Sequence, residues 1–133
     1  MREKTLYGRV SRVENMLCML LTRYGVSKQI FPSLPMGIRK EWQDMVVIDV
    51  GKGERYGSHI RYSVNVYLYG RPRGDLQEKN VRLIDEMEDK LLTAIEDGGA
   101  SHYSLQVNWS DSGYDDTRNF HFNVVNVGVT VTE

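Results

Sequence analysis

Residues 59 to 69 alternate between an apolar phase and a more polar phase, and this pattern constrains the fold more than any other. A period of two over this length is typical of a long strand with one buried and one wetter face in an antiparallel sheet. The chain must therefore supply a second layer that covers the apolar phase. The apolar phase consists of Ile60, Tyr62, Val64, Val66 and Leu68, and the opposite phase of His59, Arg61, Ser63, Asn65, Tyr67 and Tyr69.

Two other segments carry apolar residues at helical spacing and are predicted to form that second layer. The first predicts a helix over Glu3–Tyr24, which Gly25 ends with a left-handed residue. The second predicts a helix over Asp75–Asp97, with Asp75 and Glu78 as a capping box. The two apolar stripes are Leu6, Val10, Val13, Leu17, Leu20 and Tyr24, and Val81, Ile84, Met87, Leu91 and Ile95.

The stretch between these helices predicts further strands. Met45–Val50 is expected to form a hairpin with the alternating strand, through a turn at Gly51–Glu54. Lys28–Phe31 favours a short strand that Pro32 ends. Because proline cannot donate to a ladder, the residues after it are expected at an edge or in a loop.

The C-terminal part predicts a second hairpin. Residues 103 to 110 alternate again, and a polar loop is expected over Asp111–Thr117. The last strand begins at Phe120, and its apolar phase changes between Val124 and Val125. Such a change predicts either a β-bulge or a strand that leaves one sheet to join another partner.

Together these elements predict an α+β fold. Their order is helix, short strand, hairpin, helix, hairpin, which favours a two-layer sandwich of a mainly antiparallel sheet with two helices on one face. The 133 residues, 1–133, are expected to form a single domain. With 41% hydrophobic and 26% charged residues, the composition is ordinary for a globular chain.

Charge and cysteine content narrow the function classes. The chain has 17 basic and 18 acidic residues, which disfavours direct nucleic-acid binding. Its apolar run Met16–Leu21 is far shorter than the about 20 residues of a membrane span, so neither a membrane partner nor a targeting segment is expected. Cys18 within that run is the only cysteine, which excludes an intrachain disulfide and fits a reducing cytosol. A small buried side chain is favoured there over a nucleophile.

No arrangement of reactive residues predicts catalysis or metal binding. Three histidines on strands can meet as a metal site, but these fall on polar phases and lack a second ligand at short spacing, which favours surface positions. An acidic group on the second helix favours a solvated face over acid–base chemistry, and the aspartates near the last turn do not match an EF-hand loop. We therefore expect no catalytic residue, no metal, no cofactor and no enzyme activity. The histidines considered are His59, His102 and His121; the acidic group on the second helix is Asp85, Glu86, Glu88 and Asp89; and the aspartates near the last turn are Asp111, Asp115 and Asp116.

The order of elements, together with one connecting stretch, resembles a known family. A long amphipathic helix leads into Lys28–Pro35, with the letters KQIFPSLP, and then into a hairpin over Met45–Tyr69. A helix follows within Gly70–Gly98 after a Gly/Pro/Asp break, and the chain ends in two strands with a polar loop. This pattern resembles the tail-terminator and tail-completion proteins of long-tailed bacteriophages.

The resemblance implies a structural subunit without catalytic residues. Such a subunit forms a ring, commonly a hexamer, that caps the tail tube and joins it to the head. The implied partners are further copies of the chain, the tail-tube protein and the head–tail connector. The implied location is the virion tail and, before assembly, the cytoplasm of the bacterial host.

Tyr and Arg are enriched at interfaces, and these residue types suggest where contacts with other subunits form. The contact regions are expected at Pro35–Trp42, Arg71–Arg73 and Asp111–Thr117. The long valine-rich last strand is expected at a sheet edge, where it pairs with a neighbouring subunit; alternatively, the strands are internal and the tyrosines merely cover the sheet. The interface candidates are Trp42, Tyr67, Tyr69, Arg71, Arg73 and Tyr114.

Two other function classes stay open. A non-enzymatic ligand-binding or regulatory α+β module requires a pocket with convergent polar groups. A small enzyme requires reactive residues that are distant in sequence but meet in space.

Overall fold

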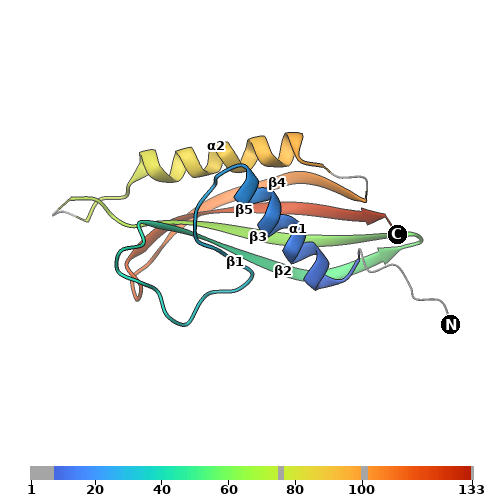
Figure 1. The fold of residues 1–133 in the computed structure, drawn as a ribbon, viewed down its shortest axis with the longest axis horizontal. Helices are drawn as coiled ribbons and strands as arrows, with labels where there is room; N and C mark the ends of the chain where they lie inside the picture. The colour runs from blue at the N-terminus through green and yellow to red at the C-terminus, as the bar shows by residue number, and fades with distance from the viewer. Residues whose placement is uncertain (1–7, 75–76, 100–101, 133) are drawn as a thin grey trace.

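The computed structural model describes residues 8–74, 77–99 and 102–132 and has an α+β fold (Figure 1). Within these ranges two helices pack on a five-stranded sheet, which confirms the predicted fold class. The elements are α1 (Val10–Arg23), β1 (Ile30–Phe31), β2 (Asp44–Tyr56), β3 (His59–Gly70), α2 (Val81–Asp97), β4 (Tyr103–Asp115) and β5 (Phe120–Thr132).

The sheet has the strand order β1-β2-β3-β5-β4 and is mainly antiparallel. The two hairpins, β2–β3 and β4–β5, lie side by side because β3 pairs with β5. The short strand β1 joins the outer side of β2 in parallel, where Ile30 pairs with Val46 and Phe31 with Val47. The last strand is therefore inside the sheet, and the prediction that it forms an edge is wrong.

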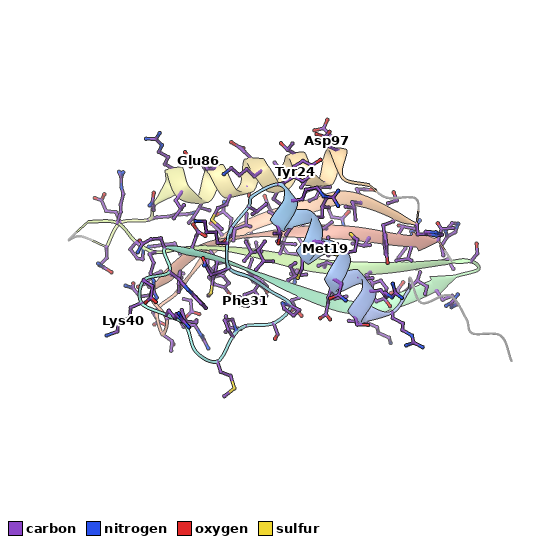
Figure 2. All side chains as sticks on the ribbon, in the orientation of Figure 1. Met19, Tyr24, Phe31, Lys40, Glu86 and Asp97 are labelled. Atoms are coloured by element: carbon purple, nitrogen blue, oxygen red, sulfur yellow. The ribbon has the colours of Figure 1, made fainter. Side chains whose placement is uncertain are left out.

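The main hydrophobic core lies between the sheet and the helices. Both helices cover the face that carries the apolar phase of β3, and Tyr62, Val64 and Val66 are buried there as predicted. Ser63 on the opposite phase is exposed. The outer side of α2 is polar and carries exposed Glu86 and Asp97 (Figure 2).

Both helices begin later in the chain than the sequence predicts. α1 begins at Val10, after a turn and a bend at residues 8 and 9, and the rest of the predicted start lies outside the described residues. α2 begins at Val81, where Asn80 accepts from the backbone N–H of Leu83 at 3.2 Å. Asp75 lies outside the described residues, but Glu78 pairs with Arg73 through both backbone groups instead of entering a helix.

Two stretches that the sequence predicts as a turn and a loop belong wholly or largely to strands. β2 continues through Gly51–Glu54 to Tyr56, with a register irregularity between Val50 and Gly53, and the hairpin turns at residues 57 and 58. Gly57 has a positive φ of 61°, which a turn of this kind requires. In β4 the strand runs on to Asp115, so only the end of the predicted Asp111–Thr117 loop is a turn. The glycines and aspartates in these two stretches are typical of turns, but here they lie within paired strands.

The change of apolar phase in β5 has a different cause from the predicted bulge. β5 pairs with β3 without interruption from His121 to Thr132, so neither a bulge nor a change of partner occurs at Val124. Instead, both faces of the sheet are apolar at different places. The side chains of Val125, Val127, Val129 and Val131 join the helix-covered core, whereas Phe120 and Phe122 lie on the opposite face.

Candidate subunit interface

A second hydrophobic cluster covers one end of the face that the helices leave open. Its buried members come from three strands, β2, β3 and β5, and its partly buried members include the loop of residues 32–43 that follows β1. We call it the aromatic cluster. The buried residues are Met45, Val47, Tyr69 and Phe120, and the partly buried ones are Phe31, Leu34, Ile38, Trp42, Tyr67 and Phe122.

Three of the six interface candidates are packed inside this cluster. The ring of Trp42 lies 5.4 Å from that of Phe31, which extends from β1 beside the loop (Figure 2). Tyr67 and Tyr69 stack at 5.9 Å, and Tyr69 also meets Phe120 edge-on at 5.7 Å. These rings cover the sheet within one chain, which matches the alternative in which the tyrosines serve the monomer.

Burial also sets the ionisation of Tyr69. Its side chain is 8% exposed, and burial raises the pKa of its phenol above the usual value; the carboxylate of Asp115 and the neighbouring Tyr67 raise the pKa further. Together these causes favour the protonated phenol over the phenolate.

Arg71 ties three loops together at the edge of the aromatic cluster. Its guanidinium donates to the backbone carbonyls of Arg39 at 3.3 Å, Trp42 at 3.2 Å and Arg118 at 2.9 Å. It also lies over the ring of Phe120, 4.0 Å from the centroid. Three of the five N–H donors of this guanidinium are thus used within the chain.

Arg73 and Tyr114 remain accessible. Arg73 is exposed, and its backbone forms the bridge to Glu78. Tyr114 is 49% exposed; its hydroxyl donates to Asn119 at 2.8 Å, and its ring lies 4.5 Å from that of His121. Because its strand partner His121 lies on the helix-covered face, Tyr114 is separated by the sheet from the aromatic cluster.

The structure brings the predicted contact regions to one end of the sheet (Figure 1). The loop of residues 32–43, the described parts of the segment between β3 and α2 (residues 71–74 and 77–80) and the turn 116–119 meet there, opposite the β2–β3 turn. Arg71 links the first and last of them, and the side-chain amide of Asn119 donates to Gln77 at 2.8 Å. Met36 at the outer part of the loop is fully exposed. We call this end of the molecule the loop end.

The sequence did not indicate that Trp109 is exposed. Trp109 continues the apolar alternation of its strand, but a register shift between Val107 and Trp109 turns it to the opposite face, where it is 49% exposed. The shift appears only when the two strands are aligned, so the alternation of one strand gives no sign of it. Met19 on α1 is also exposed, at 66% (Figure 2).

The open face beyond the aromatic cluster forms a polar groove of about 380 Å³. Two of its lining residues, Ser63 and Asn108, hydrogen-bond to Asn126, which is 4% exposed. The Asn126 amide donates to Ser63 at 2.9 Å and to Asn65 at 2.8 Å, and its oxygen accepts from Asn108 at 2.9 Å. Its walls include Lys52, Glu54, Arg61, Gln106 and Thr130.

The histidines do not form a metal site in the part of the chain that the structure describes. His59 and His102 both hydrogen-bond to Thr132, at 3.1 Å each, while His121 lies at the loop end against Tyr114. Among residues 8–74, 77–99 and 102–132, no group of three or more His, Cys, Asp or Glu side chains is arranged to hold a metal ion.

Cys18 is half-buried on α1. Burial, followed by the carboxylate of Glu14, raises the pKa of its thiol above the usual value. A thiol with a raised pKa is a weak nucleophile because the thiolate is the reactive form.

Comparisons of the sequence with models of known protein families and with curated proteins find no match. None of the helices formed by the described residues is both long enough and apolar enough to cross a membrane.

Proposed function

We propose that this chain is a structural subunit of the tail of a long-tailed phage or prophage, a tail-terminator or tail-completion protein. In this role it associates with further copies of itself and docks onto the tail tube at the head-proximal end. The observation that carries the proposal is the loop end: three segments distant in sequence meet at one end of the two-layer core. Loops held in this way are suited to contacts with large partners.

The order of elements supports the same role. A helix, a short strand, a hairpin, a second helix and a second hairpin follow one another, as in the family that the sequence resembles. The stretch Lys28–Pro35 includes β1, which joins β2, and leads into the loop of the loop end. The proposed partners are therefore the chain itself, in a ring such as a hexamer, the tail-tube protein and the head–tail connector.

The proposal is tested by deleting the gene from the phage or prophage genome that carries it. Negative-stain electron microscopy of the induced lysate is expected to show separate heads and tails, and a plasmid copy of the gene is expected to restore joined particles. Normal numbers of complete virions without the gene would refute the proposal.

The loop end is tested in the same complementation assay. Met36→Lys adds a charge to the most exposed apolar residue described at the loop end. The matched control Met19→Lys adds the same charge to an exposed residue of α1. Met36→Lys is expected to lower the yield of complete particles, whereas Met19→Lys is expected to restore them as wild type does. Equal yields for both variants would remove the loop end from the proposed contacts.

The polar groove favours a second candidate function, a non-enzymatic ligand-binding module. Its amide, hydroxyl and charged side chains converge on one concave surface, as a site for a small polar ligand requires. The test is a thermal-shift screen of polar metabolites, with Arg61→Ala as the variant expected to lose any response. A ligand that stabilises wild type and not Arg61→Ala, together with normal virions after gene deletion, would favour this function over the first.

A further inference from the structure

The β4 strand leaves one long edge of the sheet open. It is the last strand in the sheet order, and among the described residues no strand pairs with its outer side. The sequence of β4 contains neither Lys, Arg nor Pro, the residues that usually protect such an edge. Val107, Trp109 and Tyr114 are exposed along it. An edge of this kind is a template for pairing with another chain.

The opposite edge of the sheet is open over part of β2. β1 pairs only with Val46 and Val47, and within the described residues the outer side of Asp49–Glu54 has no strand partner. This stretch contains Lys52, between the two glycines of the irregular segment. Each copy of the chain therefore presents two different open strand edges.

The ladder indicates which backbone groups point outward. The N–H of Val46 donates to Gln29, outside β2, so the alternation of the strand also turns the groups of Val50 outward. Beyond the irregular segment this orientation resumes at Gly53, which pairs with Tyr62 as Val50 pairs with Val64.

In β4 the same reasoning starts from Thr132, whose N–H donates to His102 at 2.9 Å. Alternation then turns the backbone groups of Leu105 and Val107 outward. The register shift after Val107 moves the outward positions to Ser110 and Ser112. The two open edges thus each present backbone groups at known positions; the N–H of Ser112 donates to the Asp111 carboxylate at 2.8 Å within the chain, and pairing with another copy replaces this bond.

We infer that β4 of one copy pairs antiparallel with the open edge of β2 in the next copy, and this inference rests on the self-association proposed above. In the register that joins outward groups, Ser112 lies opposite Val50 and Ser110 opposite Gly53. Asp111 then lies opposite Lys52.

Charge and side-chain direction support this register. Asp111 shares a face with its partner Val124, opposite the helices, and Lys52 lines the polar groove on that same face. The ion pair therefore forms on one side of the joined sheet. All charged residues of β4 are acidic, so pairing of β4 with a second β4 gains no such pair. A contact between two different edges repeats from copy to copy and closes into a ring or grows into an open array.

Cysteine cross-linking tests the pairing. Two variants are made in a Cys18→Ser background, one with Lys52→Cys and one with Asp111→Cys, and folding is checked by circular dichroism. Mixed and oxidised, they are expected to give a cross-linked dimer that contains one chain of each kind. Ser58→Cys, in the exposed turn of the same hairpin, is the matched control for Lys52→Cys and is expected to give none.

Each outcome of this experiment decides the inference. The inference is overturned if Asp111→Cys cross-links mainly with itself, because β4 then pairs with β4. It is equally overturned if the mixture gives no more dimer than the control.

Charge reversal supplies an independent readout by sedimentation. Asp111→Lys and Lys52→Asp are each expected to weaken self-association by about fivefold, the upper value for an exposed ion pair. The double variant is expected to recover wild-type association, since the pair is restored with reversed signs. A double variant no better than the single ones contradicts the register.

The gene-deletion assay separates this inference from the proposed function. Loss of complete particles without any cross-link retains the tail function and rejects the edge pairing. A cross-linked pair together with normal virions after gene deletion retains the edge pairing and rejects the tail function.

Discussion

Replacing Arg71 with alanine is expected to destabilise the monomer rather than only an interface. The change removes three hydrogen bonds to backbone carbonyls and the contact with the Phe120 ring. Each such bond contributes about 1 kcal/mol net and the ring contact about 1 kcal/mol. The entropy of fixing an arginine side chain offsets about 2 kcal/mol of this sum. We therefore expect the free energy of unfolding to fall by about 2 kcal/mol.

Arg73→Ala is the matched control for this prediction. Arg73 lies two residues further along the chain and is exposed, and it hydrogen-bonds to Glu78, among the described residues, through its backbone. Its replacement is expected to change the free energy of unfolding by less than about 0.5 kcal/mol. Both variants are measured by urea unfolding followed by circular dichroism. Equal stabilities of the two variants would refute the role of Arg71 as a tie between loops.

Three further changes have expected outcomes. Gly113→Ala places a Cβ 2.5 Å from the ring of Phe122 and is expected to lower the stability by about 1–3 kcal/mol in thermal unfolding. The control Gly37→Ala, with no atom within 4 Å of its Cβ, is expected to leave the stability nearly unchanged. Equal losses for both variants would contradict the close packing. Asn126→Leu removes three hydrogen bonds beside the polar groove, and a loss of about 2 kcal/mol is expected in urea unfolding; unchanged stability would contradict it. The raised pKa of Cys18 lowers its thiolate fraction at any given pH, so its reaction with a thiol reagent at pH 8 is expected to be slower than that of free cysteine and to accelerate as pH rises through the raised pKa; an equal rate at pH 8 would refute it.

The parts of the fold that could be predicted are those where one strand or helix carries its own signal. The alternation of β3 and the apolar stripe of α2 follow directly from burial against a single layer. The start of α2 could not be predicted from its letters because Glu78 pairs with Arg73 across a short bridge, and Asn80 takes the capping position. Such a bridge depends on the path of the loop in space.

Features that depend on how two strands pair could not be predicted from the sequence of either strand. The bulge that turns Trp109 outward exists only relative to β5, and the edge position of β4 depends on the pairing of β3 with β5. For the candidate site, the sequence named Trp42, Tyr67 and Arg71 as residue types that favour contacts. Residue type alone does not tell whether the contact is made with a partner or, as here, within the chain.

The two apolar phases of β5 make its position along β3 unique. A strand with one apolar phase can slide by two residues along its neighbour and still direct its apolar side chains to the same face. In β5 the switch of apolar side chains from one face to the other coincides with the boundary between the aromatic cluster and the polar groove. A slide of two residues toward either end moves this switch away from the boundary. A valine then faces the polar groove, or an asparagine faces the aromatic cluster. A slide of one residue brings Phe120 beneath the helices. Misaligned hairpins are thus penalised on both faces at once, so the chain is expected to reject slipped pairings during folding as well as at equilibrium.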